Sequence, residues 1–238
     1  MKLLMPYVTA GITADWTSYV SAFAAAGADM VEIGLPFSDP TLDGPTIQEA
    51  TASALRRGVT MDQIFHDMSE LSLQTPLIAS TYANLVIREG AEQFCKRLKD
   101  AGFAGLIVPD LPLEECDEVA RHIDLALLAS PATPDARLAE IGRRSRRFVY
   151  AVTVMGTTGE RAELAASAAT LAARLRTRTE LPVLLGFGIS TPAQAAEAAG
   201  LADGVVVGAA IMRRILDGAT PAEAGAYVGE LRAAITGG

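Results

Sequence analysis

The sequence predicts a single (β/α)8 barrel, the TIM-barrel form of the α/β class, on three observations. The chain has 238 residues, and one such barrel typically needs about 250, so we expect one domain over residues 1–238. Half of the residues are hydrophobic and only 5% are aromatic, which indicates a large aliphatic core. Short aliphatic runs alternate with alanine-rich stretches along the chain, and this alternation is typical of parallel strands joined by helices.

The expected elements follow from this alternation. Strands are expected in the β-branched or aliphatic runs, at residues 3–9, 28–34, 76–81, 104–108, 124–129, 147–153, 182–186 and 204–208. Helices are expected between them, at residues 14–26, 46–57, 61–72, 90–101, 114–122, 135–145, 160–178, 192–199, 209–217 and 221–235. Several helices should end near glycine, as at Gly27, Gly102 and Gly200, because glycine adopts the left-handed conformation that terminates a helix.

Charge and composition exclude several classes of partner. The net charge is −8, which argues against nucleic acid or an anionic membrane. The basic residues are scattered apart from one cluster near the end of an expected helix, at Arg143, Arg144, Arg146 and Arg147. No apolar run approaches the roughly 18–20 residues that span a bilayer. Cys95 and Cys116 lack metal-ligand spacing, and two free thiols fit a cytoplasmic protein.

Glu32 stands inside the second expected strand, where apolar residues are the rule. An ionised group taken out of water costs several kcal/mol unless it is paired or its pKa shifts. Alternate side chains of a strand share a face, so Met30, Glu32 and Gly34 should point into the barrel and the apolar residues between them toward the helices. Glu32 is therefore either a barrel-lining group satisfied by hydrogen bonds or a catalytic acid–base.

The loops after the strands hold the chemistry in this fold. The loop after the second expected strand carries two further carboxylates, Asp39 and Asp43. Glycine gathers in the last three loops, at residues 156–159, 186–190 and 208. Backbone N–H groups there could approach a phosphate closely, although ordinary tight turns would use the same residues.

The other reactive residue types narrow the chemistry. The three lysines, Lys2, Lys96 and Lys99, do not stand at expected strand ends, which disfavours a Schiff base. The two histidines, His66 and His122, fall in expected helices, which disfavours a histidine-bound metal. We therefore expect carboxylate acid–base catalysis with no metal and no cofactor.

Several of these segments together resemble one known family. The most specific is Val-Glu-Ile-Gly-Leu-Pro-Phe-Ser-Asp-Pro at residues 31–40, followed by Asp-Gly-Pro-Thr-Ile-Gln at residues 43–48. Supporting matches lie at residues 82–86, 108–112, 132–135, 158–159 and 186–190. From about Pro6 to about Met212, the chain resembles the α subunit of tryptophan synthase.

The resemblance implies a reaction and a partner. The family cleaves indole-3-glycerol phosphate to indole and glyceraldehyde 3-phosphate, a retro-aldol step of tryptophan biosynthesis. It usually passes the indole through a tunnel to a pyridoxal-phosphate β subunit in an α2β2-type complex. The α subunit itself would carry no cofactor.

The resemblance also implies roles for individual residues. Glu32 would protonate the indole C3 and take a hydroxyl proton, whereas Asp43 would hydrogen-bond the indole N–H and stabilise the positive charge that forms. Asp39 would meet the β subunit. The substrate-binding and phosphate-binding residues would be Tyr82, Tyr150 and Phe187 around the substrate, Thr158 on a closing loop, and Gly159, Gly188, Gly208 and Ala209 at the phosphate.

The chain departs from the family pattern in several places. The family has a helix before the first strand that plugs the bottom of the barrel, and this chain starts almost on that strand. Apolar residues 3–5 are therefore expected to be covered by another chain or partly exposed to water. Ser80 and Thr81 replace large apolar residues near the indole, Ala209 replaces a serine, and Leu42 replaces an alanine.

Three functions remain open from the sequence. The first is the α subunit of a tryptophan synthase. The second is a stand-alone indole-3-glycerol-phosphate lyase of secondary metabolism, which would be fully active without a partner. The third is a binding protein that only activates a β subunit, and the intact carboxylates Glu32 and Asp43 count against it.

Overall fold

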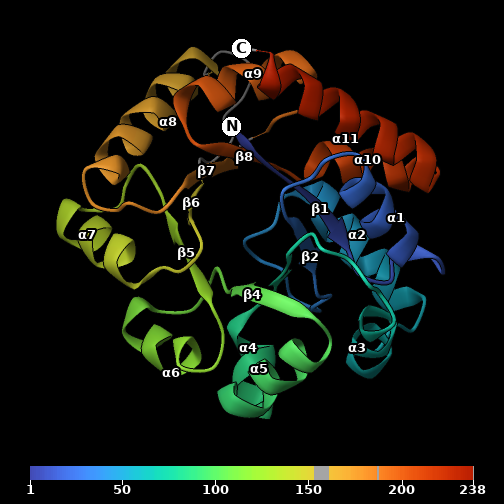
Figure 1. Ribbon diagram of the computed structural model, residues 1–238. Helices are drawn as coiled ribbons and strands as arrows, with labels where there is room; N and C mark the ends of the chain where they lie inside the picture. Colours follow the sequence, from blue (N-terminus) through green and yellow to red (C-terminus); the bar gives the residue numbers. More distant parts are fainter. Residues whose placement is uncertain (153–160, 187, 238) are drawn as a thin grey trace.

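The computed structural model describes residues 1–152, 161–186 and 188–237 and confirms the barrel. The eight strands pair in parallel and in sequence order, and β8 pairs with β1 to close the sheet (Figure 1). They are β1 (Leu3–Thr9), β2 (Val31–Gly34), β3 (Leu77–Ser80), β4 (Phe103–Ile107), β5 (Leu125–Ala129), β6 (Val149–Val152), β7 (Val183–Gly186) and β8 (Gly204–Val207). Each overlaps a strand expected from the sequence.

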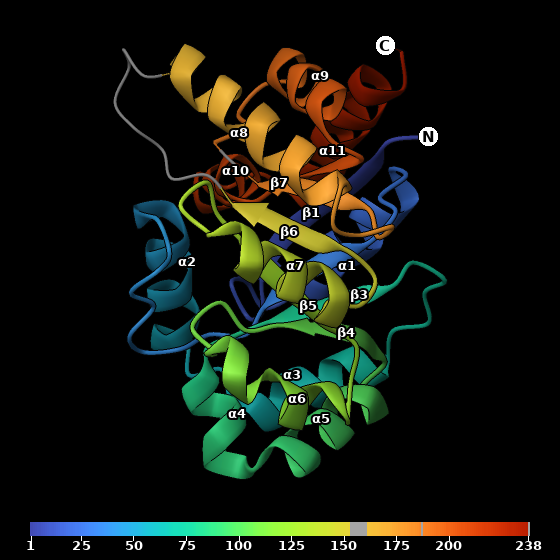
Figure 2. The ribbon, with the colours of Figure 1, turned by 90° about the vertical axis from the view of Figure 1, so that its left-hand side faces the viewer.

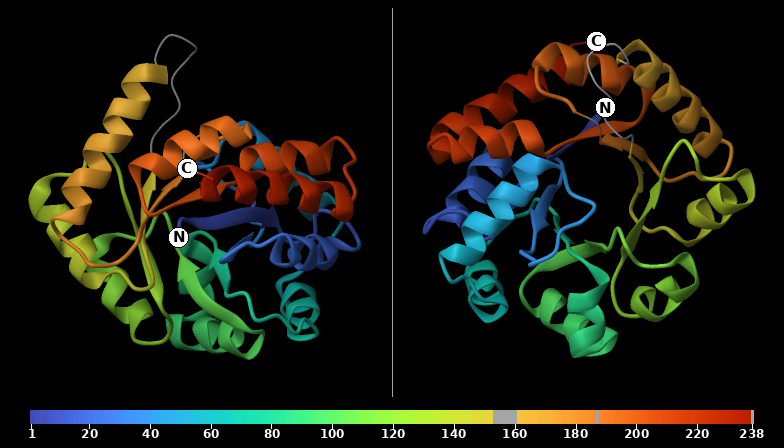
Figure 3. Two further views of the ribbon diagram at one scale, coloured as in Figure 1. Left: turned by 45° about the horizontal axis from the view of Figure 1, so that its top comes forward. Right: turned by 180° about the vertical axis from the view of Figure 1, so that it is seen from behind.

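The helices form a ring outside the strands, as the views from the side and from behind show (Figures 2 and 3). They are α1 (Trp16–Ala25), α2 (Pro45–Arg56), α3 (Met61–Ser69), α4 (Ala83–Glu89), α5 (Ala91–Asp100), α6 (Cys116–Ala120) after a short 3-10 turn (Leu113–Glu115), α7 (Asp135–Arg144), α8 (Arg161–Arg176), α9 (Pro192–Leu201), α10 (Ala209–Leu216) and α11 (Pro221–Thr236). A capping box at Thr220 and Glu223 fixes the start of α11.

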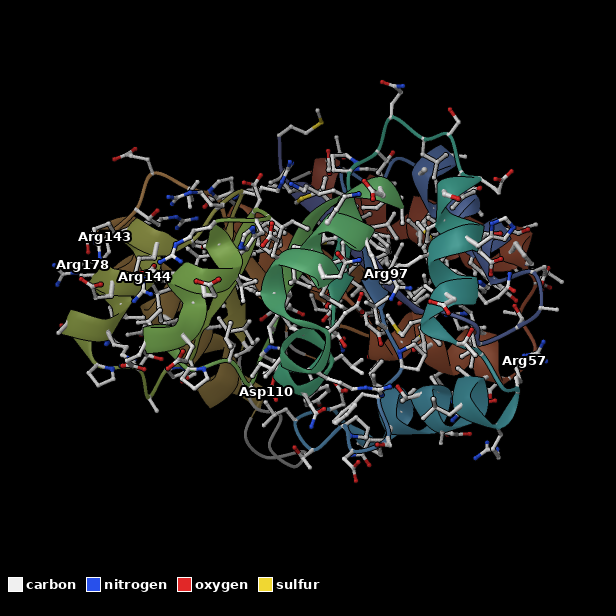
Figure 4. All side chains as sticks on the ribbon, turned by 90° about the horizontal axis from the view of Figure 1, so that it is seen from below. Arg57, Arg97, Asp110, Arg143, Arg144 and Arg178 are labelled. Atoms are coloured by element: carbon white, nitrogen blue, oxygen red, sulfur yellow. The ribbon has the colours of Figure 1, made fainter. Side chains whose placement is uncertain are left out.

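Two local expectations are wrong. The sequence predicts no helix between residues 81 and 90, but α4 begins directly after Tyr82, where the Asp110 carboxylate accepts a hydrogen bond of 2.7 Å from the Ala83 N–H. Asp110 is labelled in Figure 4. Gly200 lies inside α9 rather than ending a helix. Gly27 and Gly102, by contrast, have the expected positive φ, +91° and +89°.

The interior of the barrel is filled by one cluster of side chains, separate from the layer between strands and helices. Its buried members are Met5, Met30, Ile78, Ile107, Ala126, Phe148, Leu184 and Val206. The alternation expected in β2 is confirmed: Met30 belongs to this cluster, whereas Val31 and Ile33 pack in the outer layer. Glu32 therefore stands on the inner face, above an apolar floor.

The expectation that the barrel's lower end is partly wet is wrong for two of the three residues named. Leu4 and Met5 are fully buried, Met5 in the interior cluster and Leu4 in the outer layer, while Leu3 is half-buried. The chain ends lie on the same side of the barrel (Figure 2), and the Arg232 guanidinium of α11 donates to the Lys2 carbonyl at 2.6 Å. The described residues thus cover this end of β1 themselves.

Three arginines of the basic cluster near the end of α7, Arg143, Arg144 and Arg147, pair with carboxylates. Arg144 pairs with Asp117 at 2.9 Å, and Arg143, labelled beside it in Figure 4, pairs with Glu140. Such exposed pairs contribute little to stability. Among the described residues, no helix combines the length and apolar character that crossing a membrane requires.

Candidate active site

A cavity of about 510 Å³ opens at the carboxyl ends of the strands, a volume in the range of small-molecule sites. Its wall comes from strands on both sides of the barrel, from the loop after β2, and from the first turns of α2 and α10. The residues proposed from the sequence that line it are Glu32, Asp43, Tyr82, Tyr150, Gly188, Gly208 and Ala209.

Glu32 lies on β2, and only 5% of it is exposed. Burial raises the pKa of its carboxyl group from 4.5 to about 7; the nearby Ser80 side chain lowers the pKa, and the nearby Asp43 raises it. A carboxyl group with a pKa near 7 can both give and take a proton at neutral pH. The Ser80 departure from the family pattern therefore acts on the protonation of Glu32.

Asp43 is held by the aromatic side chain at the start of α4. The Tyr82 hydroxyl donates to Asp43 Oδ2 at 3.0 Å and accepts from the Leu42 N–H at 3.0 Å. Phe37 stacks on the Tyr82 ring with 5.3 Å between centroids. Burial raises the pKa of the Asp43 carboxyl group, and the Tyr82 hydrogen bond opposes this. Tyr82 thus holds the Asp43 carboxylate and also the backbone of the loop that carries it.

Two tyrosines cross the cavity where glycines leave room. A methyl group at Gly186 would lie 2.4 Å from the Tyr150 ring, and one at Gly34 would lie 1.9 Å from the Tyr7 hydroxyl. Tyr150 lines the cavity and also packs against the interior cluster. Tyr7 was missed, although alternation along residues 3–9 would have placed it on the inner face with Met5.

The opposite wall of the cavity is built from glycines and the start of a helix. Gly188, with φ +35°, follows β7, and Gly208 precedes the first turn of α10, whose first residue is Ala209. Arg213, one turn further along α10, also lines the cavity and pairs with Glu49 at 2.7 Å. Arg213 stands within a helix rather than in a loop after a strand, so the pattern of the loops does not reveal it.

The remaining sites expected from the sequence lie elsewhere. Thr158, Gly159 and Phe187 fall outside the described residues. Asp39 is exposed and does not line the cavity. Thr81 lines it, and the Thr81 hydroxyl is buried without a hydrogen-bond partner in the described part of the chain. The described residues contain no cluster of His, Cys, Asp and Glu that could hold a metal ion.

Comparisons with known proteins point to one family. The family model described as tryptophan synthase alpha chain matches residues 1–233. A tryptophan synthase alpha chain of Chloroflexus aggregans is 43% identical over 96% of this chain and 90% of its own. One of Streptomyces coelicolor is 47% identical over 89% of this chain and 79% of its own.

Solved structures give the same result. Tryptophan synthase subunit alpha of Legionella pneumophila superposes with a TM-score of 0.89 at 31% identity, covering 99% of this chain and 93% of that one. A chain from a tryptophan synthase structure of M. tuberculosis does so with a TM-score of 0.88 at 33% identity, covering 98% and 92%. The fold is the same, and the relatives match nearly end to end. This chain therefore belongs to the tryptophan synthase alpha chain family.

Proposed function

We propose that Glu32 and Asp43 carry out the reaction of this family, the cleavage of indole-3-glycerol phosphate to indole and glyceraldehyde 3-phosphate. The observation that carries the assignment is a buried Glu32 with a pKa of about 7 in the same cavity as a tethered Asp43. Two carboxyl groups in different environments can take different roles, one as acid–base and the other as a stabiliser of charge.

Glu32 would act twice. As a carboxylic acid it gives its proton to C3 of the indole, which leaves the ring positively charged. As a carboxylate it then takes the proton of the hydroxyl group on the adjoining carbon. The bond between that carbon and C3 breaks, its electron pair returns to the ring, and an aldehyde remains. Glu32 ends protonated, so the next turnover can begin.

Asp43 would accept a hydrogen bond from the indole N–H while the ring carries positive charge. A negative group that is already held in place stabilises that charge most, because the group does not have to move during the reaction. The Tyr82 hydroxyl provides this fixation, because it bonds both Asp43 and the Leu42 backbone. We therefore assign Tyr82 as a positioning residue for Asp43, and Tyr150 as a wall of the indole site.

The phosphate would be bound at the opposite wall. Backbone N–H groups at the start of α10, around Gly208 and Ala209, and at Gly188 suit an anion, and Ala209 keeps its N–H although it lacks a serine hydroxyl. Thr158, Gly159 and Phe187 are assigned to the same substrate by family resemblance. Arg213 adds a positive side chain to a cavity whose other charged lining residues, within the described chain, are Glu32 and Asp43.

The chain works in tryptophan biosynthesis together with a β subunit, and we propose Asp39 as part of the contact. Asp39 is exposed, in the loop that carries Asp43, and its neighbour in sequence Pro40 lines the cavity. The relatives reported above are named as alpha chains or come from tryptophan synthase, and none favours the stand-alone lyase. Two buried free cysteines fit the cytoplasm as the site of action.

An assay of indole release tests this function. The purified chain should release indole from indole-3-glycerol phosphate slowly alone and faster with a tryptophan synthase β subunit. Full activity alone, unchanged by a β subunit, would instead identify a stand-alone lyase. No release in either condition would contradict the catalytic assignment.

The phosphate site gives a separate prediction. Glycerol 3-phosphate should raise the melting temperature of the protein, because a ligand that binds only the folded state stabilises it. Gly188→Val should lose this shift, since valine tolerates the positive φ of Gly188 poorly and blocks approach to the backbone. Gly200→Ala is the matched control, because Gly200 lies in α9 with no atom within 4 Å of an added methyl group. Equal shifts in both variants would place the phosphate elsewhere.

A further inference from the structure

We propose that the Tyr7 hydroxyl donates a hydrogen bond to the middle hydroxyl group of the substrate's glycerol chain, the one that takes no part in bond cleavage. Tyr7 would thus select substrates by the three-carbon chain rather than by the indole or the phosphate. The inference rests on the proposed function, because it assumes where the two ends of the substrate lie.

The order of the strands places Tyr7 between those two ends. The phosphate wall is built after β7 and β8, and Glu32 stands on β2. In the closed barrel, β1 lies between β8 and β2. Tyr7 pairs in register with Glu32, and it is the residue of β1 that lines the cavity. A glycerol chain that joins a phosphate at β8 to an indole C3 at Glu32 must pass β1.

The Tyr7 side chain extends across this gap. A methyl group at Gly208, on the phosphate wall, would lie 3.5 Å from Tyr7 Cβ. The Tyr7 hydroxyl reaches the other side, where the absence of a side chain at Gly34 accommodates it. The ring therefore runs from the phosphate wall toward the carboxylates, and its polar end lies on the side of the carboxylates.

The hydrogen bond between the Tyr7 and Thr9 hydroxyl groups leaves the hydroxyl proton of Tyr7 available to a group in the cavity. Thr9 is fully buried, and its hydroxyl group has one partner within the described residues, the Tyr7 oxygen at 3.2 Å. A buried hydroxyl proton without an acceptor is costly, so Thr9 donates and Tyr7 accepts. Tyr7 then has its own proton to donate.

The surroundings keep Tyr7 in the neutral, proton-bearing form. Burial raises the pKa of the Tyr7 phenol, and the negative charges of Asp43 and Glu32 raise it further, against a hydrogen bond with Thr9 that lowers it. A neutral phenol is a donor at any pH at which the protein is folded and active. The group it would meet is a hydroxyl oxygen, which accepts readily.

The contribution of the middle hydroxyl group to binding is measured with two ligands that the protein cannot cleave and that differ only in this group. The first is 3-(indol-3-yl)propyl phosphate, which lacks both hydroxyl groups. The second is 3-(indol-3-yl)-2-hydroxypropyl phosphate in the substrate's configuration, which adds only the middle one. Their dissociation constants are measured by calorimetry on the wild-type chain, on Tyr7→Phe and on Thr9→Val. Thr9→Val is the matched control, because it removes the same intramolecular hydrogen bond and keeps the Tyr7 hydroxyl.

The wild-type chain should bind the hydroxylated ligand roughly 3- to 10-fold more tightly than the other, the range of one neutral hydrogen bond. Thr9→Val should keep this ratio, and Tyr7→Phe should reduce it to about 1. The double variant Tyr7→Phe/Thr9→Val has neither of the two hydroxyl groups, so no buried hydroxyl is left unpaired. Its affinity ratio should also be about 1. A wild-type ratio of 1, a ratio that survives in Tyr7→Phe, or a loss in Thr9→Val would overturn the proposal. Indole release by the wild-type chain tests the proposed function independently.

Discussion

Glu32→Gln is expected to lower indole release by about 10²- to 10⁴-fold, the range of one acid–base group. Glutamine has the same shape but can neither give nor take the proton. Turnover of indole-3-glycerol phosphate by the purified variant measures the loss. Turnover close to that of the wild type would contradict the role of Glu32.

The stability of the same variant is the control for folding. Burial raises the pKa of Glu32 from 4.5 to about 7, so the unfolded state binds fewer protons than the folded state between these values. The Glu32 contribution to stability therefore falls as pH rises from about 4.5 to about 7. Glutamine has no such dependence. Glu32→Gln should melt at the same temperature as the wild type or higher at pH 8, which separates lost chemistry from lost structure.

Asp43→Asn is expected to lower turnover by about 10²-fold, with a small effect on the Michaelis constant. Asparagine keeps the shape and one acceptor oxygen of the side chain, but it has no charge to offset the positive ring. The kcat of the variant measures this electrostatic contribution.

Tyr82→Phe tests how much the position of Asp43 contributes, because it leaves the charge of Asp43 in place. It keeps the stacking on Phe37 and loses the hydrogen bond that holds Asp43, so a smaller loss of about tenfold is expected. A larger loss in Tyr82→Phe than in Asp43→Asn would mean that Tyr82 acts on the substrate directly rather than through Asp43.

Local patterns predicted the barrel because each βα unit repeats the same signals. Alternation in β2 predicted that Glu32 faces inward, since strand periodicity needs no knowledge of partners. The short helix α4 was missed because its start depends on Asp110, 27 residues later. A contact of this kind leaves no trace in the local pattern.

The same limit applies to the candidate site. The link between Tyr82 and Asp43 spans 39 residues, and the sequence could place both residues near the substrate only through family resemblance. Ser80 was recognised as a departure from the family, but its effect on the Glu32 pKa requires the pairing of β2 with β3. The expectation of a wet lower end is wrong because Met5 packs with side chains of the other strands in the interior cluster, a contact that the pattern along one strand does not reveal.

The central claim, that Glu32 reacts as a buried acid with a pKa near 7, is tested most directly by the pH dependence of kcat/KM, which reports the groups of the free protein. The wild-type chain should lose activity as pH rises above about 7, where Glu32 loses its proton. In Ser80→Ala this bend should move to higher pH, because the Ser80 hydroxyl that lowers the Glu32 pKa is gone, whereas a bend caused by the substrate phosphate should stay where it is. Activity that is constant from pH 6 to about 9, or a bend that Ser80→Ala leaves in place, would contradict the claim.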